Sequence, residues 1–147
     1  MSGKGIIKMG TTIRPELSVK NPYWIEKHRY YELKHFCMQY PIWKKNYKAL
    51  SGIISRPKEI VQLGKMRYVS NPTEKTAMLK LQYSRYIDLI ERIALKTDPE
   101  LATYLIKGVT EGISYDLLKI KMDVPCSKDS YYLLYRKFFW LLDKARD

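Results

Sequence analysis

The side chains best suited to contacting a polar partner lie near the carboxyl end, in the stretch GISYDLLKIKMDVPCSKDSYYLLYRKF at residues 112–138. Hydroxyl and cationic groups, which bind phosphates and base edges in DNA complexes, gather there at the start of a predicted helix. The free backbone amides of such a helix start also attract phosphate. We therefore expect contacts with double-stranded DNA from Ser127, Lys128, Asp129, Ser130, Tyr132 and Arg136.

Other combinations of reactive residues are incomplete. His28 and His35 are seven residues apart with Cys37 nearby, but a metal site needs more ligands at better spacing. Cys37 and Cys126 are the only cysteines, which gives no disulfide framework. The carboxylates are not arranged with a nucleophile, and no glycine-rich phosphate loop is present. We expect no enzyme activity, no metal and no cofactor.

The charge of the chain favours a polyanionic partner. Its net charge is +12, and residues 1–57 carry 11 Lys or Arg against 3 acidic residues, whereas residues 98–147 carry 8 of each. A second candidate DNA contact is therefore the basic helical face formed by Lys44, Lys45 and Lys48, beside Trp43 and Tyr47. A face that is merely solvated would show the same pattern.

Turn and cap residues divide the chain into helices, and no segment has a convincing strand pattern. Residues 1–20 contain three glycines and no apolar periodicity, which predicts a flexible basic arm. Residues 21–97 form a helical region with a connecting loop at 53–71. Its expected helices cover about 26–39, a second segment from Pro41 that ends at Ser51 and Gly52, and about 73–96. The last has an apolar stripe through Met78, Leu81, Ile87 or Tyr86, Ile90, Ile93 and Ala94.

Residues 98–147 predict three successive helices. Asp98 with Pro99 starts the first and Gly112 ends it, Ser114 caps a short helix over 115–122, and Ser127 caps the last, over about 128–145. In the last helix, apolar residues at steps of four and three form the packing face: Tyr131, Tyr135, Phe138, Leu142 and Ala145. We expect an all-α protein, a helical bundle that ends in a helix-turn-helix.

Two core helices meeting at a corner would give the same terminal pattern. The turn has Asp123 where a helix-turn-helix usually has glycine, and Pro125 with Cys126 makes it about two residues longer than the tightest turn. Tyr132 and Leu133 are unusual choices for a polar groove. The alternative is that they contact a second copy of the chain or a polymerase subunit.

The segment ISYDLLKIKMDVPCSKDSYYLLYRKFFWLLDKAR resembles region 4 of sigma factors at Ser114, Asp116, Leu118, Val124, Ser127, Ser130 and Arg136. More of the chain, YYELKHFCMQYPIWKKNYKAL followed by SNPTEKTAMLKLQYSRYIDLIERIAL, resembles phage late-gene transcription regulators of the RinA and ArpU type. This second resemblance covers residues 22–146 by layout, and its motifs are short. It implies a sigma-like helix-turn-helix in a regulator of phage or prophage late genes.

Two functions follow as expectations. The first is a DNA-binding transcriptional regulator, with host RNA polymerase and a second copy of the chain as further candidate partners. The second is a phage assembly or packaging protein, similar to a small terminase subunit, that binds DNA nonspecifically and uses Tyr132, Leu133 and Trp140 for subunit contacts. With no apolar run of about 18 residues and no secretory signal pattern, we expect a cytoplasmic protein of a bacterial host, without a membrane partner.

Overall fold

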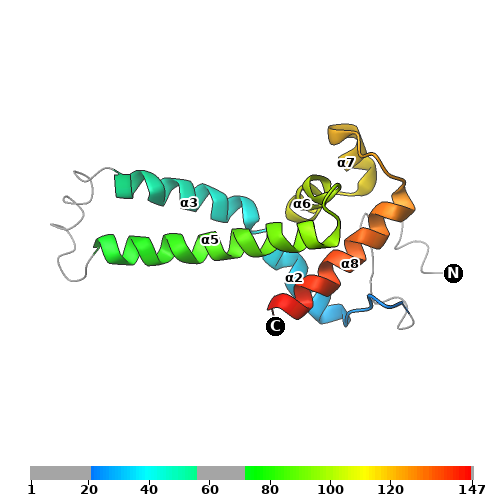
Figure 1. The fold of residues 1–147 in the computed structure, drawn as a ribbon, viewed down its shortest axis with the longest axis horizontal. Coiled ribbons are helices and arrows are strands. Elements are labelled where there is room, and N and C mark those ends of the chain that lie inside the picture. The colour runs from blue at the N-terminus through cyan, green and yellow to red at the C-terminus, as the bar shows by residue number, and fades with distance from the viewer. Residues whose placement is uncertain (1–20, 56–71, 147) are drawn as a thin grey trace. The chain divides into compact units, whose positions relative to one another are not determined.

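The computed structural model describes residues 21–55 and 72–146, and the regular structure of these residues is entirely helical (Figure 1). The expected arm at 1–20 and residues 56–71 of the expected loop lie outside the described residues. None of the described helices is long and apolar enough to cross a membrane. The helices are α2 (Lys27–Cys37), α3 (Tyr40–Ser55), α5 (Pro72–Thr97), α6 (Ala102–Glu111), α7 (Tyr115–Met122) and α8 (Lys128–Arg146).

Most helix boundaries lie within one or two residues of those that the cap residues predict. Two differ by more. Helix α3 continues through Ser51 and Gly52 to Ser55, because one glycine inside a helix costs only about 1 kcal/mol. Helix α6 begins at Ala102, because Asp98 closes a turn first: its carboxylate accepts hydrogen bonds from the amides of Glu100 and Leu101, at 2.9 and 3.1 Å.

The chain divides into two compact units. Of the described residues, unit 1 contains 21–38 and 90–146, and unit 2 contains 39–55 and 72–89. Helix α2 therefore belongs with α6, α7 and α8, whereas the sequence placed it in a region ending at residue 97. The reason is packing between segments far apart in sequence, since α2 lies directly against α8 and α6.

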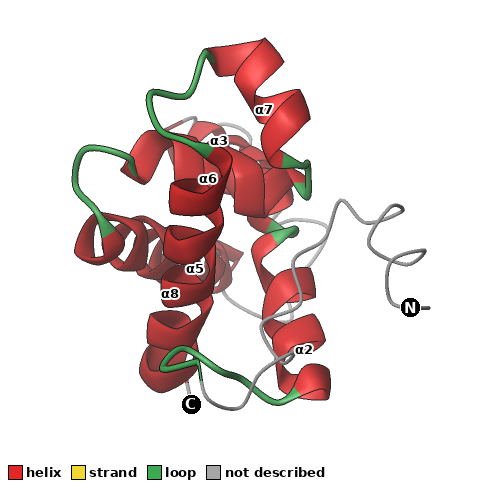
Figure 2. Ribbon diagram, turned by 90° about the vertical axis from the view of Figure 1, so that its right-hand side faces the viewer, coloured by secondary structure: helices red, strands yellow, loops and turns green. Residues whose placement is uncertain are grey.

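Aromatic side chains dominate the core of unit 1, where α2 and α8 run side by side (Figure 2). The hydroxyls of Tyr30 and Tyr135 share a hydrogen bond of 2.8 Å, and the Tyr30 ring stands edge-on to Phe139 at 5.3 Å. Four of the five residues in the predicted packing face of α8 are buried, namely Tyr131, Tyr135, Phe138 and Leu142. The expectation for Ala145 was wrong, since it is exposed. Phe139 is buried instead because α2 covers a second face of the helix.

An ion-pair network ties α2 to the last turns of α8. The Arg29 Nε lies 2.5 Å from Oδ1 of Asp143, and its Nη1 lies 2.9 Å from Oε1 of Glu32. Arg146 lies 3.6 Å from Glu32 and places its guanidinium over the Phe36 ring, 4.0 Å from the centroid. These contacts hold the two helices in one register at their solvent-facing border.

Unit 2 pairs α3 with the first part of α5 in an antiparallel arrangement (Figure 1). The rings of Trp43 and Tyr86 are 4.9 Å apart, and Lys80 lies over the Tyr47 ring at 5.1 Å. The apolar stripe predicted for α5 is buried only in its last part, at Ile90, Ile93 and Ala94. Met78 and Leu81, which belong to the same predicted stripe, are 65% and 50% exposed.

Candidate DNA-binding site

The site predicted to contact DNA is formed by α7, the turn that follows it, and the beginning of α8 (Figure 2). Helix α6 leads into it. Gly112 ends α6 in the left-handed conformation, with φ of 64°, which glycine adopts without steric cost. Two residues later the Ser114 hydroxyl accepts a hydrogen bond from the Leu117 amide at 3.2 Å and begins α7. Both of these predicted cap positions are confirmed.

Asp123 takes the backbone conformation that a glycine usually provides in such a turn. Its φ is 57° and its ψ is 60°, in the left-handed region, and its amide donates to the Lys119 carbonyl at 2.8 Å. Aspartate is one of the few residues with a side chain that enters this region at a modest cost. The missing glycine therefore does not prevent α7 from ending in a tight left-handed cap.

Tyr115 fixes the corner between α7 and α8. Its hydroxyl donates a hydrogen bond to the Cys126 carbonyl at 2.5 Å, and its amide donates to the Tyr132 hydroxyl at 3.0 Å. Val124 is buried under the same turn. Tyr115 could not be identified from the sequence, because no local pattern shows that a residue at the start of one helix will form hydrogen bonds across the turn to the next.

The first turn of α8 is exposed, whereas most of the helix beyond it packs into the core. Ser127 caps the helix, since its hydroxyl oxygen accepts a hydrogen bond from the Ser130 amide at 3.1 Å. Ser127, Lys128, Asp129 and Ser130 are all exposed, and Tyr131 is the first buried residue of the helix. A flat or grooved partner can therefore reach these four residues without any rearrangement of the core.

The remaining predicted contacts in this region have partners within the protein or are partly covered. Lys128 lies 3.3 Å from the Asp116 carboxylate, but both side chains are mostly exposed, so this pair is weak and available for exchange. Tyr132 is half-buried and accepts the hydrogen bond from Tyr115, so it is part of the corner. Arg136 is half-buried on the next turn of the helix.

Helix α7 carries exposed residues that the sequence analysis did not single out. Ile120 is 80% exposed and Leu117 is 40% exposed, while Leu118 between them is buried. Leu133, on α8, is 49% exposed. Adjacent apolar residues on a short helix give no sequence signal for which of them will be covered.

The predicted basic face lies on α3, in unit 2. Lys44, Lys45 and Lys48 are all exposed, and the ammonium group of Lys44 lies 5.2 Å from the centroid of the Tyr40 ring. Helix α3 has no acidic residue between its ends. Helix α3 itself therefore contributes only positive charge to this face, and the nearest acidic residue in the same hollow as Lys44 is Asp88 of α5.

The reactive groups considered for other chemistry are dispersed. Cys37 is fully buried, and burial raises the pKa of its thiol well above the ordinary value, so it stays protonated. His28 and His35 are exposed on the same helix. Within the two described stretches, no three His, Cys, Asp or Glu residues lie close enough together to hold a metal ion.

Comparison with known proteins adds no relative: no family model, no curated protein and no solved structure gives a significant match to this chain.

Proposed function

We propose that this protein binds double-stranded DNA through the beginning of α8 and acts as a regulator of transcription. The observation that carries the proposal is the contrast within α8. Its first turn is exposed and offers hydroxyl, amide and cationic groups, while Tyr115 and the aromatic core hold the rest of the helix in place. A recognition helix needs this combination, because its leading side chains must enter a groove at a fixed angle.

The distribution of charged residues supports the same proposal, with a different kind of DNA contact for each of the two units. Residues 98–147 are electrically neutral, so they are suited to reading bases rather than to neutralising phosphates. The Lys44, Lys45 and Lys48 face of α3 supplies positive charge for the backbone. The phage and prophage context of the proposal comes only from the resemblance of the sequence to the RinA and ArpU type of regulator.

The proposal is tested by replacing Lys128 and Arg136 with alanine and measuring binding to a DNA site selected from a random pool. We expect the double variant to bind the selected site at least about tenfold more weakly, since a good side-chain contact to a base contributes about 1–3 kcal/mol. Lys144→Ala is the matched control, because Lys144 is an exposed cation at the opposite end of the same helix. Equal affinities for the double variant and the control would refute this docking.

The alternative, a DNA-packaging or assembly protein, is favoured by one observation. Leu133 and Ile120 are large apolar side chains that remain exposed near the candidate site, as subunit contacts would be before assembly. Light scattering separates the two functions, because a closed ring of many subunits fits only the packaging protein.

A further inference from the structure

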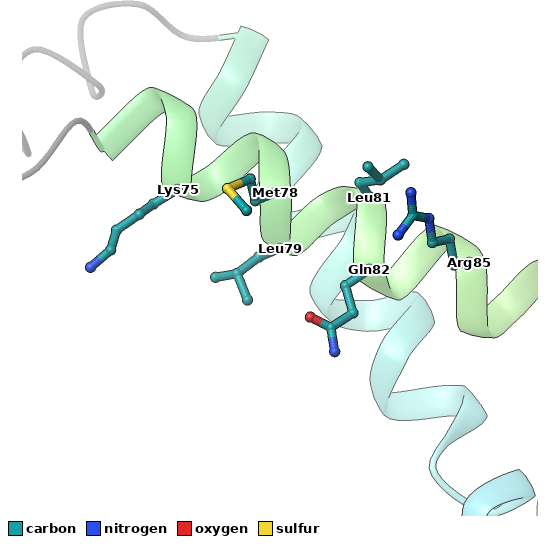
Figure 3. Close-up of a pocket in the computed structure, with 6 residues that line it drawn as sticks. All are labelled: Lys75, Met78, Leu79, Leu81, Gln82 and Arg85. Atoms are coloured by element: carbon teal, nitrogen blue, oxygen red, sulfur yellow. The ribbon is translucent and has the colours of Figure 1, made fainter.

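The first part of α5 has an apolar surface that nothing in the described structure covers. Lys75, Met78, Leu79, Leu81, Gln82 and Arg85 line an open hollow of about 550 Å³, and all six side chains extend from this one helix (Figure 3). Met78, Leu79 and Leu81 are 65%, 46% and 50% exposed. The same segment contacts α3 through Tyr86 and Lys80, so it already has one partner within unit 2.

The exposed side has the residue spacing of a helix-pairing seam. Glu74, Met78, Leu81 and Arg85 follow one another at steps of four, three and four, which places them on one face of the helix. All four are exposed. The seam therefore has two apolar residues in its middle, an acidic residue at one end and a basic residue at the other.

This order of residues is complementary to itself when the helix is reversed. The midpoint between Met78 and Leu81 is also the midpoint between Glu74 and Arg85, between residues 79 and 80. A two-fold axis through that point places Met78 of one copy against Leu81 of the other. It also places each Glu74 against an Arg85, once on either side of the apolar centre. A two-fold interface requires this kind of reciprocal matching.

We propose that this seam, formed by Glu74, Met78, Leu81 and Arg85, binds a second copy of the chain as an antiparallel helix pair. Charge selects the orientation, because a parallel pair would bring Glu74 against Glu74 and Arg85 against Arg85. It also selects the partner. A uniformly acidic helix would match Arg85 but would be repelled by Glu74, whereas the reversed copy matches both.

The size of the seam sets the expected strength of the dimer. One helix pair of about three turns buries less surface than the roughly 1,200 Å² at which specific, stable interfaces begin. We therefore expect a reversible dimer that forms at micromolar concentrations and dissociates on dilution. The proposal concerns unit 2 alone and does not depend on DNA binding.

Sedimentation velocity over a range of concentrations, without DNA, tests the proposal. Glu74→Arg and Arg85→Glu should each raise the dimer dissociation constant about tenfold or more, because each change replaces two attractions with two repulsions. The double variant E74R/R85E should dimerise nearly as well as the natural protein, since it restores both pairs in reversed form. Glu100→Arg and Lys144→Glu make the same changes of charge at exposed positions outside the seam and should leave the dimer dissociation constant unchanged.

Glu74 also lies in the first turn of α5, where a carboxylate stabilises the helix, so a second measurement separates pairing from folding. When the E74R and R85E chains are mixed, each chain meets its complement at both ends, and heterodimers should form although neither chain dimerises well alone. The proposal is overturned if the natural protein stays monomeric or forms larger assemblies, if the single variants behave like the controls, or if neither the double variant nor the mixture recovers dimerisation. Loss of selected-site binding in K128A/R136A is measured separately and tests only the proposed function.

Discussion

At the scale of single residues, a close contact in unit 1 joins α6 and α8 at Gly108 and Tyr131. The Tyr131 hydroxyl is buried, has no hydrogen-bond partner in the described structure, and rests on Gly108. Burial also raises the pKa of this hydroxyl well above its ordinary value, so it remains neutral. An unsatisfied buried hydroxyl costs about 1–3 kcal/mol, and here it coincides with a glycine that leaves room for it.

A double-mutant cycle measures this contact. Gly108→Ala should destabilise the fold by about 2 kcal/mol or more, despite the higher helix propensity of alanine, because the new methyl group would overlap the Tyr131 hydroxyl. Tyr131→Phe should be neutral or slightly stabilising, since it removes the unsatisfied group. When Gly108→Ala is made in the Tyr131→Phe variant, the cost of the alanine should shrink by about half. Urea unfolding of the four proteins gives the coupling, and an unchanged cost would contradict the contact.

At the scale of elements, cap chemistry predicts most of the helix boundaries, whereas packing partners are not predicted. Ser114, Gly112 and Ser127 act where their backbone preferences place them, because capping depends on a few neighbouring residues. The position of α2 against α8 depends on contacts about 105 residues apart in sequence, such as that between Tyr30 and Tyr135. Periodicity could not show this, nor that Met78 lies in an uncovered part of its stripe.

The same distinction applies within the candidate site. The exposure of Lys128, Asp129 and Ser130 follows from their positions before the first buried residue of α8. The hydrogen bond to the Tyr132 hydroxyl could not be predicted, because its donor lies 17 residues earlier, on another helix. Contact of these residues with DNA stays a prediction.

The ion-pair network between α2 and α8 should make the folded state less stable at low pH, because it contains the carboxylate of Glu32. A hydrogen bond from Arg29 lowers the pKa of Glu32 from its ordinary value of 4.5. The ionised Glu32 carboxylate therefore stabilises the folded state above pH 4.5, and this stabilisation is lost as the pH falls through the lowered pKa. Glu32→Gln should lower the melting temperature by about 1 °C at pH 7, since the carboxylate is largely exposed. The difference from the natural protein should vanish at a pH well below 4.5. Thermal melts across this range check the prediction, with Glu100→Gln as the control, and a difference that persists at low pH would contradict it.

At the scale of the whole molecule, the proposed function assigns two kinds of contact to two units. The sequence-reading contacts belong to α8 in unit 1, where Ser127 to Ser130 are exposed. The phosphate contacts belong to the basic face of α3 in unit 2, which carries three lysines and no acid. Such a division predicts that variants in the two units fail in different ways. If two copies also pair through α5, each complex carries two α8 helices, and the selected DNA site should show two-fold symmetry.

Salt dependence separates the two kinds of contact. Replacing Lys44, Lys45 and Lys48 with alanine should weaken binding to selected and random DNA alike, because phosphates carry no sequence information. Each lost phosphate contact should reduce the slope of log affinity against log salt by about 0.9, or nearly 3 for the triple variant. K128A/R136A should instead reduce the preference for the selected site, with a smaller change of slope. Anisotropy titrations at several salt concentrations measure both quantities. The assignment of phosphate contacts to α3 would be contradicted by a triple variant that lost its preference for the selected site but kept the slope of log affinity against log salt. Only a face that neutralises phosphates releases counterions, so its loss must change that slope.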